Sequence, residues 1–208
     1  MYAAMADPYC YPGTAVLKNR LGLRDQAGLD AFEKEVANAR ADQDVPAGRL
    51  NYRHYRAIHR HLFQDAYSWA GRIRTVRISK GGNPFCYPEH IDREMKRLFA
   101  DLKDREFLRG VGVAEFAAGA AHFLAEVNAI HPFREGNGRT QLSFLKILAE
   151  RASYPLAWSV AAHRIILSTI VQSFGGDERP LSQTIEGLVR NSKKSTRPAR
   201  RPPPAPRR

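Results

Sequence analysis

Apolar residues recur at steps of three and four along most of the chain, which is the spacing of an amphipathic helix. The stripe is clearest between residues 88 and 102. The same pattern predicts helices over about 25–41, 51–66, 88–102, 113–129, 139–152 and 160–174, and a last helix from Pro180 onward. A short helix that is capped by Thr14 and ended by Gly22 is also expected. The sequence therefore predicts a mostly α fold.

Between residues 73 and 87 the period changes to that of a strand. Ile73, Val76 and Ile78 are β-branched, a glycine-rich turn follows them, and a second short apolar run comes after the turn. This order predicts a β-hairpin over 73–87. A lone hairpin is marginally stable, so we expect it to pack on the helices. Its open edge could pair with an extended segment of another protein.

Composition limits the class of protein. The 208 residues are 43% hydrophobic and 26% charged, which is typical of a soluble globular domain. No apolar run is long enough to span a membrane, and the first residues lack the basic and apolar regions of a secretory signal. Cys10 and Cys86 are far apart, which argues against a disulfide framework or a zinc site. We therefore expect a cytoplasmic protein.

The net charge of +12 is concentrated at the C-terminus. Residues 191–208 hold seven basic residues and no acid, so the rest of the chain carries only +5. This segment is rich in proline and offers little to bury, so we expect a disordered basic tail. The sequence is thus divided into a domain over 1–190, with a lead-in over about 1–50 and a core over about 51–190, and a tail. DNA or RNA binding rests on this charge alone, and nucleic acid is not expected as the main ligand.

The residues with the clearest chemistry lie between His131 and Arg139. The imidazole of His131 can accept a proton near neutral pH. Gly136 and Gly138 let backbone N–H groups turn toward an anion, and the positive end of the next helix would point there too. Glu135 could hold a divalent metal ion, and Arg139 could bind a phosphate through paired N–H donors. Any one of these residues alone would be typical of an ordinary glycine turn between two helices. Together they indicate phosphoryl or nucleotidyl transfer.

This stretch resembles the signature of the Fic family, His-x-Phe-x-(Asp/Glu)-Gly-Asn-Gly-Arg-x-x-Arg, through Arg139, and departs from it at Leu142. The resemblance implies a helical fold and, for most members, transfer of AMP from ATP to a hydroxyl group of another protein. It implies that His131 deprotonates this hydroxyl and that Glu135 holds Mg²⁺. The residues that would bind the nucleotide in the loop are Gly136, Asn137, Gly138 and Arg139. In the family the last arginine contacts the γ-phosphate, a contact that Leu142 would not make.

Other positions extend the resemblance. The lead-in resembles the start of many Fic proteins, so the domain over 1–190 is expected to be Fic-like throughout. In Fic proteins a flap at the place of the 73–87 hairpin holds the target segment beside the histidine, and Lys80 and Gly81 match its tip. The target protein is therefore expected to dock on this hairpin. Asn128 matches a position that contacts the ligand, although a helix-capping asparagine is the alternative.

A possible restraint on activity lies near the C-terminus. Fic activity is commonly restrained by a helix with the pattern Ser/Thr-x-x-x-Glu-Gly/Asn, and Ser182–Gly187 matches it. In the family this glutamate pairs with the last arginine of the signature, which is Leu142 here. We therefore interpret Glu186 as a surface charge. Any restraint is expected to come from a separate antitoxin-like protein.

The leading hypothesis is a protein adenylyltransferase that uses ATP and Mg²⁺. The family includes bacterial toxins and effectors that are secreted into a host cell, and the sequence does not assign the chain to either group. Two alternatives follow from Leu142: a catalytically altered Fic protein with another phosphate-containing donor, or a non-enzymatic regulatory or nucleotide-binding protein with a decayed site.

Overall fold

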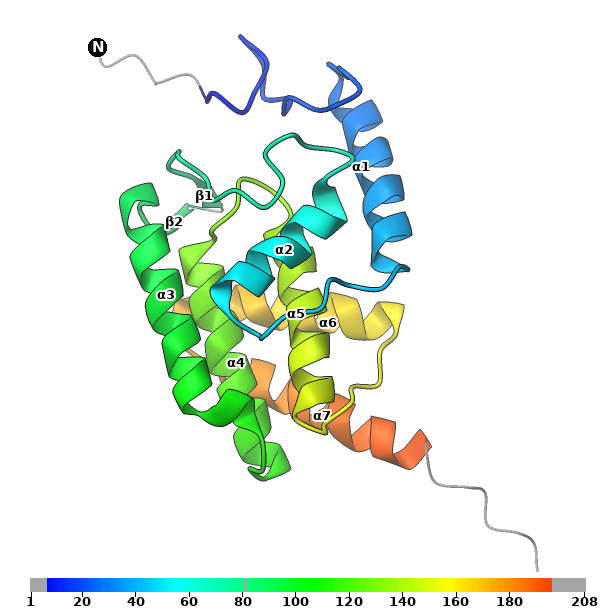
Figure 1. Cartoon of the computed structure of the whole chain (residues 1–208), viewed down its shortest axis with the longest axis vertical. Coiled ribbons are helices and arrows are strands. Elements are labelled where there is room, and N and C mark those ends of the chain that lie inside the picture. The colour runs from blue at the N-terminus through cyan, green and yellow to red at the C-terminus, as the bar shows by residue number, and fades with distance from the viewer. Residues whose placement is uncertain (1–6, 81, 196–208) are drawn as a thin grey trace, which may run out of the picture.

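The structure is a computed structural model that describes residues 7–80 and 82–195. Within them the chain forms seven α-helices and one pair of very short strands (Figure 1). The helices are α1 (Gln26–Ala41), α2 (Tyr52–Phe63), α3 (Pro88–Asp104), α4 (Val113–Ile130), α5 (Asn137–Arg151), α6 (Val160–Gln172) and α7 (Arg179–Ser195). The strands are β1 (Ser79–Lys80) and β2 (Asn83–Pro84), and two 3₁₀ turns are η1 (Glu106–Leu108) and η2 (Ser173–Gly175). The prediction of a mostly α fold is confirmed.

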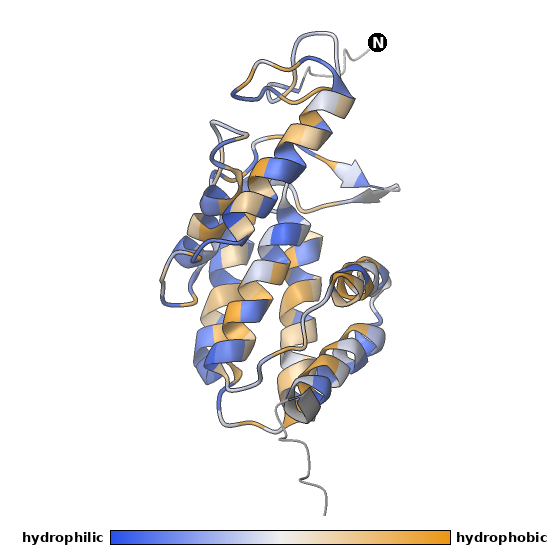
Figure 2. Ribbon diagram, turned by 90° about the vertical axis from the view of Figure 1, so that its right-hand side faces the viewer, coloured by the Kyte–Doolittle hydropathy of each residue, from blue (hydrophilic) through white to orange (hydrophobic). Residues whose placement is uncertain are grey.

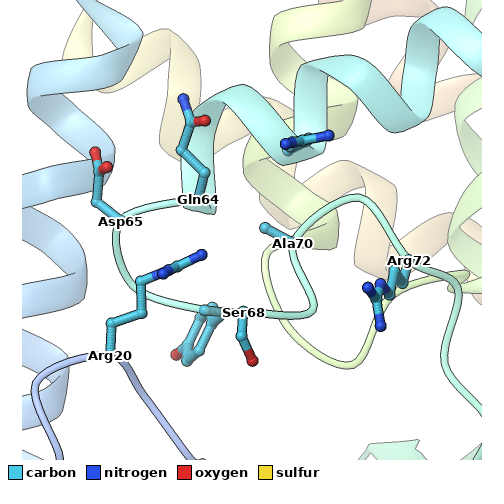
Figure 3. Close-up of a pocket in the computed structure, with 8 residues that line it drawn as sticks. Arg20, Gln64, Asp65, Ser68, Ala70 and Arg72 are labelled. Carbon is cyan, nitrogen blue, oxygen red and sulfur yellow. The ribbon is translucent and has the colours of Figure 1, made fainter.

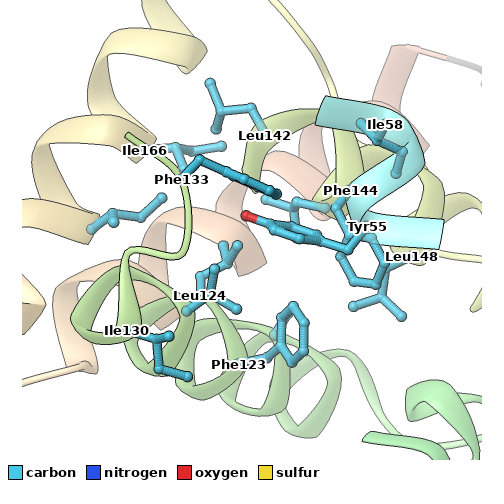
Figure 4. Packing of buried hydrophobic residues seen from close by; sticks show 14 of the residues in the cluster. Tyr55, Ile58, Phe123, Leu124, Ile130, Phe133, Leu142, Phe144, Leu148 and Ile166 are labelled. Carbon is cyan, nitrogen blue, oxygen red and sulfur yellow. The ribbon is translucent and has the colours of Figure 1, made fainter. Parts of the chain in front are cut away.

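Helix α4 is the centre of the molecule. It is buried along most of its length, and α3, α5, α6 and α7 all pack on it. Tyr55 of α2 stacks on Phe133, which follows α4, and contacts Phe144 of α5 edge-on, and all three rings are fully buried (Figure 4). Most other helices carry a hydrophobic stripe on one side and hydrophilic residues on the other (Figure 2). The core thus fixes the loop between α4 and α5 through Phe133.

In the described part of the chain, no helix combines the length and the apolar character that crossing a membrane requires.

Side-chain caps set where several helices begin. Asp25 accepts a hydrogen bond from the N–H of Gly28 at 2.6 Å before α1, and Asn51 accepts one from the N–H of His54 at 2.9 Å before α2. Ser159 caps α6 in the same way. These caps satisfy N–H groups that have no partner within the helix. The seven helices agree with those predicted from residue 25 onward to within a few residues, apart from the end of α7.

The helix expected between Thr14 and Gly22 is absent, so this prediction is wrong. The segment is irregular, and an isolated β-bridge joins Cys10 to Leu17. The Thr14 hydroxyl donates to the carbonyl of Tyr11 at 3.1 Å and so closes a turn. Threonine caps turns as readily as helices, and too few apolar residues follow here to decide for a helix.

The hairpin predicted over 73–87 is present but much shorter. β1 and β2 pair antiparallel through only two residues each. Below them the guanidinium group of Arg74 bridges the two arms, because it donates to the carbonyls of Val76 and Cys86, both at 2.6 Å. A buried side chain therefore takes the place of the ladder hydrogen bonds expected between the arms.

Helix α7 continues beyond the predicted end of the domain. It runs to Ser195, whereas the sequence predicts a disordered tail from Asn191. Lysine is a good helix former, so the sequence at 193–194 is compatible with another turn of helix. The remainder of the predicted tail, residues 196–208, lies outside the described residues.

Candidate active site

A cavity of about 890 Å³ lies between the loop that follows α4, the hairpin and the C-terminal half of α6. Its size is typical of a small-molecule site. Eight of the predicted site residues line it: Lys80, Asn128, His131, Glu135, Gly136, Asn137, Gly138 and Arg139. The ninth, Gly81, lies outside the described residues. Residues from the hairpin, from α4 and from α5 thus meet at one place.

His131 ends α4 in a left-handed conformation, with φ of 50° and ψ of 64°, which residues other than glycine seldom adopt. Its Nδ1 lies 3.3 Å from the carbonyl oxygen of Asn128, and because a carbonyl can only accept, Nδ1 carries the proton. Nε2 of the neutral ring is then free to accept a proton. The ring of Phe85 stacks on the imidazole with the centroids 3.9 Å apart, which fixes the plane of the ring.

The surroundings of His131 keep its imidazole neutral. Burial lowers the pKa of His131 to about 4. The hydrogen bond to Asn128 opposes this shift, and the positive charges of Arg74 and Lys80 add to it. At neutral pH the ring is therefore in the form that can accept a proton. Negatively charged phosphates bound in the cavity would raise this pKa again and make the imidazole a stronger base.

Arg74 connects the hairpin to the end of α4. It is 1% exposed, and all of its side-chain hydrogen bonds within the described residues go to backbone carbonyls. The guanidinium group donates to His131 at 2.8 Å and to Ile130 at 3.1 Å, in addition to Val76 and Cys86 in the two arms. One cation therefore holds the hairpin against the loop and places its charge beside His131.

The N-terminus of α5 supplies the anion-binding end of the cavity. Gly136 precedes the helix with a φ of 81°, and a Cβ atom there would lie 2.4 Å from the ring of Phe63, so glycine is required. The first N–H groups of a helix have no partner within it, and together with the helix dipole they attract anions. Asn137, Gly138 and Arg139 begin α5 and line the cavity, so their N–H groups are suited to bind a phosphate.

The side chain of Asn137 closes the loop. Its Oδ1 accepts from the N–H of Phe133 at 3.0 Å, and its Nδ2 donates to the carbonyl of Phe133 at 2.8 Å. The resemblance to Fic proteins assigns Asn137 to nucleotide binding, but here both polar atoms of its buried amide are used within the loop. Its contribution to an anion site would come from its backbone N–H.

Glu135 and Arg139 lie at the same edge of the cavity. Oε1 of Glu135 accepts from the next backbone N–H at 2.8 Å and lies 3.9 Å from the Arg139 guanidinium group. On its other side Arg139 pairs with Glu33 of α1, and its guanidinium group lies over the ring of Phe63, 4.5 Å from the centroid. The guanidinium group is thus held in place, while several of its five N–H donors remain for a phosphate.

Leu142 does not line the cavity. It is 6% exposed and packs in the core near Phe133 and Ile166 (Figure 4). The phosphate contact that Fic proteins make from this position is therefore missing. Glu186, in the predicted restraint pattern, pairs with Arg190 of the same helix at 2.5 Å and lies outside the cavity lining.

Reasoning from the sequence missed several residues that shape the site. No local signal set Arg74 apart, because Arg72, Arg77 and Lys80 lie in the same stretch of the chain. Glu33 lies 106 positions from Arg139, and Phe85 is likewise distant from His131, so no local pattern reveals these contacts. The apolar wall of the cavity has the pattern of an ordinary core and is made by Leu167, Ile170, Val171 and Phe174.

Acid is expected to destabilise the protein, because histidines that are neutral in the folded state, among them His59 and His131, must take up protons. Burial lowers the pKa of His59 to about 3 and that of His131 to about 4. Histidine in an unfolded chain has a pKa of about 6.5, so below that pH the unfolded state binds more protons than the folded state. The neutral histidines therefore stabilise the folded state fully above about pH 6.5, and this contribution to the free energy of unfolding is lost as the pH falls toward 4.

The free energy of unfolding, measured by urea titration from about pH 7 to about pH 5, should fall by a few kcal/mol. The slope should be shallower in His131→Asn than in the wild type, and replacement of the exposed His90 by asparagine serves as the control for loss of a histidine. An unchanged slope in the His131 variant would contradict the assignment of a low pKa to this group.

Comparison with known proteins assigns the family. The model of the Fic/DOC family matches residues 49–149. A probable protein adenylyltransferase of Sinorhizobium fredii, y4lH, is 51% identical over 90% of this chain and 98% of its own. A probable protein adenylyltransferase Fic of Escherichia coli is 40% identical over 73% of this chain and 76% of its own.

Solved structures show the same fold. The BepC protein of Bartonella tribocorum with bound AMPPNP is 25% identical, with a TM-score of 0.76 over 86% of this chain and 95% of its own. The N-terminal Fic domain of a Bartonella quintana effector with bound ADP is 26% identical, with a TM-score of 0.75 over 86% of this chain and 93% of its own. With the signature loop lining the cavity, these matches show that the chain belongs to the Fic/DOC family.

Proposed function

We propose that this chain is a protein adenylyltransferase, which transfers AMP from ATP to a tyrosine, threonine or serine hydroxyl of another protein. The observation that carries the proposal is the neutral imidazole of His131 in one cavity with the N-terminus of α5. Attack of a hydroxyl on a phosphate needs a proton acceptor and a group that stabilises negative charge. The imidazole would supply the first and the N-terminus of α5 the second. The relatives' names and the nucleotides in the solved Fic domains support the same activity.

His131 would act as the general base. Its Nε2 accepts the proton of the target hydroxyl while the hydroxyl oxygen attacks the α-phosphorus of ATP. A bond forms between this oxygen and the α-phosphorus, the bond to the oxygen that bridges to the β-phosphate breaks, and the electron pair leaves with pyrophosphate. The first N–H groups of α5 and the guanidinium group of Arg139 stabilise the developing charge. The apolar wall on α6 and η2 fits the adenine ring.

Glu135 is suited to hold Mg²⁺ together with the phosphates. Within the loop only Oε1 accepts a hydrogen bond, so Oε2 remains available as a hard oxygen ligand. No three His, Cys, Asp or Glu side chains are grouped as metal ligands among the described residues. Mg²⁺ commonly binds through one carboxylate, substrate phosphates and water, so Glu135 fits without further acidic partners. Bound there, Mg²⁺ would neutralise charge on the phosphates.

Removal of Mg²⁺ with EDTA is expected to abolish AMP transfer, and added Mg²⁺ should restore it. Glu135→Gln should raise the Mg²⁺ concentration needed for half-maximal transfer by about 10- to 100-fold, because the amide is a weaker ligand than the carboxylate. Glu150→Gln, which removes an exposed carboxylate near the other end of α5, is the matched control and should behave as the wild type. An unchanged Mg²⁺ requirement in Glu135→Gln would rule out this role.

The target protein would dock on the 73–87 hairpin. The two strands are short, their outer edges are unpaired within the described residues, and Ile78, Ser79 and Lys80 line the cavity that holds His131. An extended target segment paired with this edge would bring its hydroxyl group to the imidazole. Restraint would come from a separate antitoxin-like protein, since Glu186 is engaged with Arg190 outside the cavity.

The proposal is tested with ATP labelled at either the α- or the γ-phosphate, incubated with the purified chain and bacterial or eukaryotic lysates. Label retained in protein from the α-phosphate alone is the expected result. Retention of the γ-phosphate would instead indicate a kinase-like reaction. A second candidate, transfer from another phosphate-containing donor, is favoured by the buried Leu142, and protein modification with that donor but not with ATP would select it.

A further inference from the structure

A second pocket lies away from the active-site cavity and shares no lining residue with it (Figure 3). Its volume is about 430 Å³. It is formed where the lead-in segment meets the end of α2 and the turn that follows, and its lining residues are Arg20, Arg60, Gln64, Asp65, Tyr67, Ser68, Ala70 and Arg72. The pocket is open and polar, unlike the partly apolar cavity around His131.

Three arginines from three separate segments surround this pocket. Arg20 comes from the lead-in, Arg60 from α2 and Arg72 from the following loop. Within the described residues, none of their guanidinium groups makes a hydrogen bond, an ion pair or a ring contact. Three like charges around one pocket repel one another unless an anion lies between them.

The one carboxylate in the lining does not neutralise these arginines. Asp65 is bound by Arg40 through two parallel hydrogen bonds, Nε to Oδ2 at 2.6 Å and the terminal nitrogen to Oδ1 at 2.9 Å. The pKa of Asp65 is lowered most by this hydrogen bond, and the charge of Arg20 contributes less than that of Arg40. Figure 3 shows Asp65 at the margin, beside α1, while the guanidinium group of Arg20 extends toward the centre. The interior of the pocket is left with net positive charge.

The backbone that carries these side chains is held firmly. The N–H of Arg20 donates to the carbonyl of Ala66 at 2.9 Å, which joins the lead-in to the turn. The N–H of Gly71 donates to Nδ1 of the buried His59 at 2.8 Å. The ring of Tyr67 stacks on Trp69 with centroids 4.3 Å apart. These contacts fix the backbone positions from which the three exposed arginine side chains extend.

We propose that this pocket binds a small phosphate-containing anion such as pyrophosphate. Guanidinium groups bind phosphate oxygens in pairs and with strong geometric preference. Gln64 and Ser68 add neutral donors, and the volume suits a small ligand rather than a folded partner. The site is separate from the proposed catalytic cavity, so the proposal of an anion site does not depend on whether the chain transfers AMP.

The test is calorimetric titration of the full chain with pyrophosphate, without ATP or metal. Arg139→Gln serves as the starting protein, because it weakens anion binding in the catalytic cavity. Adding Arg60→Gln and Arg72→Gln should weaken pyrophosphate binding at least about tenfold, since two charge-assisted contacts are lost. Adding Arg49→Gln and Arg53→Gln instead removes two exposed charges outside the pocket and should change the affinity less than about twofold. Circular dichroism confirms that every variant is folded.

Several results would overturn the proposal. One is the absence of saturable pyrophosphate binding to the Arg139→Gln protein. Another is an equal loss of affinity in the control pair, which would mean that net charge alone attracts the anion. A third uses a single-stranded oligonucleotide: if the oligonucleotide binds through Arg60 and Arg72 while pyrophosphate does not, the pocket belongs to a nucleic-acid surface, not to a small-anion site.

Discussion

His131→Asn is expected to lower the rate of AMP transfer by about 10²- to 10⁴-fold, the usual contribution of a general base. Asparagine is chosen because it tolerates the left-handed conformation at the end of α4, so the loop should keep its shape. The variant removes Nε2, the atom that accepts the hydroxyl proton. Affinity for ATP should remain within a few-fold of the wild type, because the N–H groups of α5 and Arg139 are unchanged.

The measurement is the initial rate of transfer with α-labelled ATP, together with ATP binding by calorimetry. His122→Asn is the matched control, since this histidine lies on the same helix but is exposed and pairs with Glu178. In the wild type, kcat/KM should begin to fall only toward pH 4, not near pH 6.5, because the pKa of His131 is lowered to about 4 in the free enzyme. A His131 variant that keeps its rate within about tenfold would exclude this group as the base.

Arg74→Met is expected to destabilise the protein by about 3 kcal/mol or more, a large part of the stability of a typical domain. Methionine has a similar length but no donors, so the four carbonyls that converge on the guanidinium group would lose their partner. Two arms of the hairpin and the end of α4 would then separate. Transfer activity should fall as well, because Arg74 fixes the backbone that presents His131.

Urea unfolding at neutral pH measures this effect. Arg77→Met is the control, because Arg77 is exposed and its guanidinium group lies over Tyr87, 4.1 Å from the ring centroid. The control should change stability by less than about 1 kcal/mol. If Arg74→Met were equally mild, water or relaxed backbone would be satisfying the four carbonyls instead.

The helices could be predicted because their signals are local. The apolar stripe of α3 lies within the helix itself, and the caps at Asp25 and Asn51 are adjacent to the helices that they begin. The loop that lines the cavity could be singled out for the same reason, since His131 through Arg139 are consecutive. The Thr14 segment was mispredicted because a threonine cap signals a turn and a helix alike.

The rest depends on contacts between distant residues. The hairpin is short because Arg74 occupies the space between its arms, and the sequence does not show that an arginine will be buried there. The anchoring of Arg139 by Glu33 requires α1 to lie beside α5. The pocket around Arg60 joins segments that are neighbours only in the folded chain. Periodicity carries no information about such contacts.

The left-handed conformation of His131 lowers the stability of the fold at a residue proposed to be needed for activity. Helices most often end in this conformation with glycine, which adopts it without the cost of about 1 kcal/mol that a residue with a Cβ atom bears. Selection for stability alone would therefore favour glycine here, at the cost of the imidazole proposed as the base. The proposed role of His131 as the base accounts for a histidine at this position. In lineages of this fold that abandon catalysis, this position should be among the first to change.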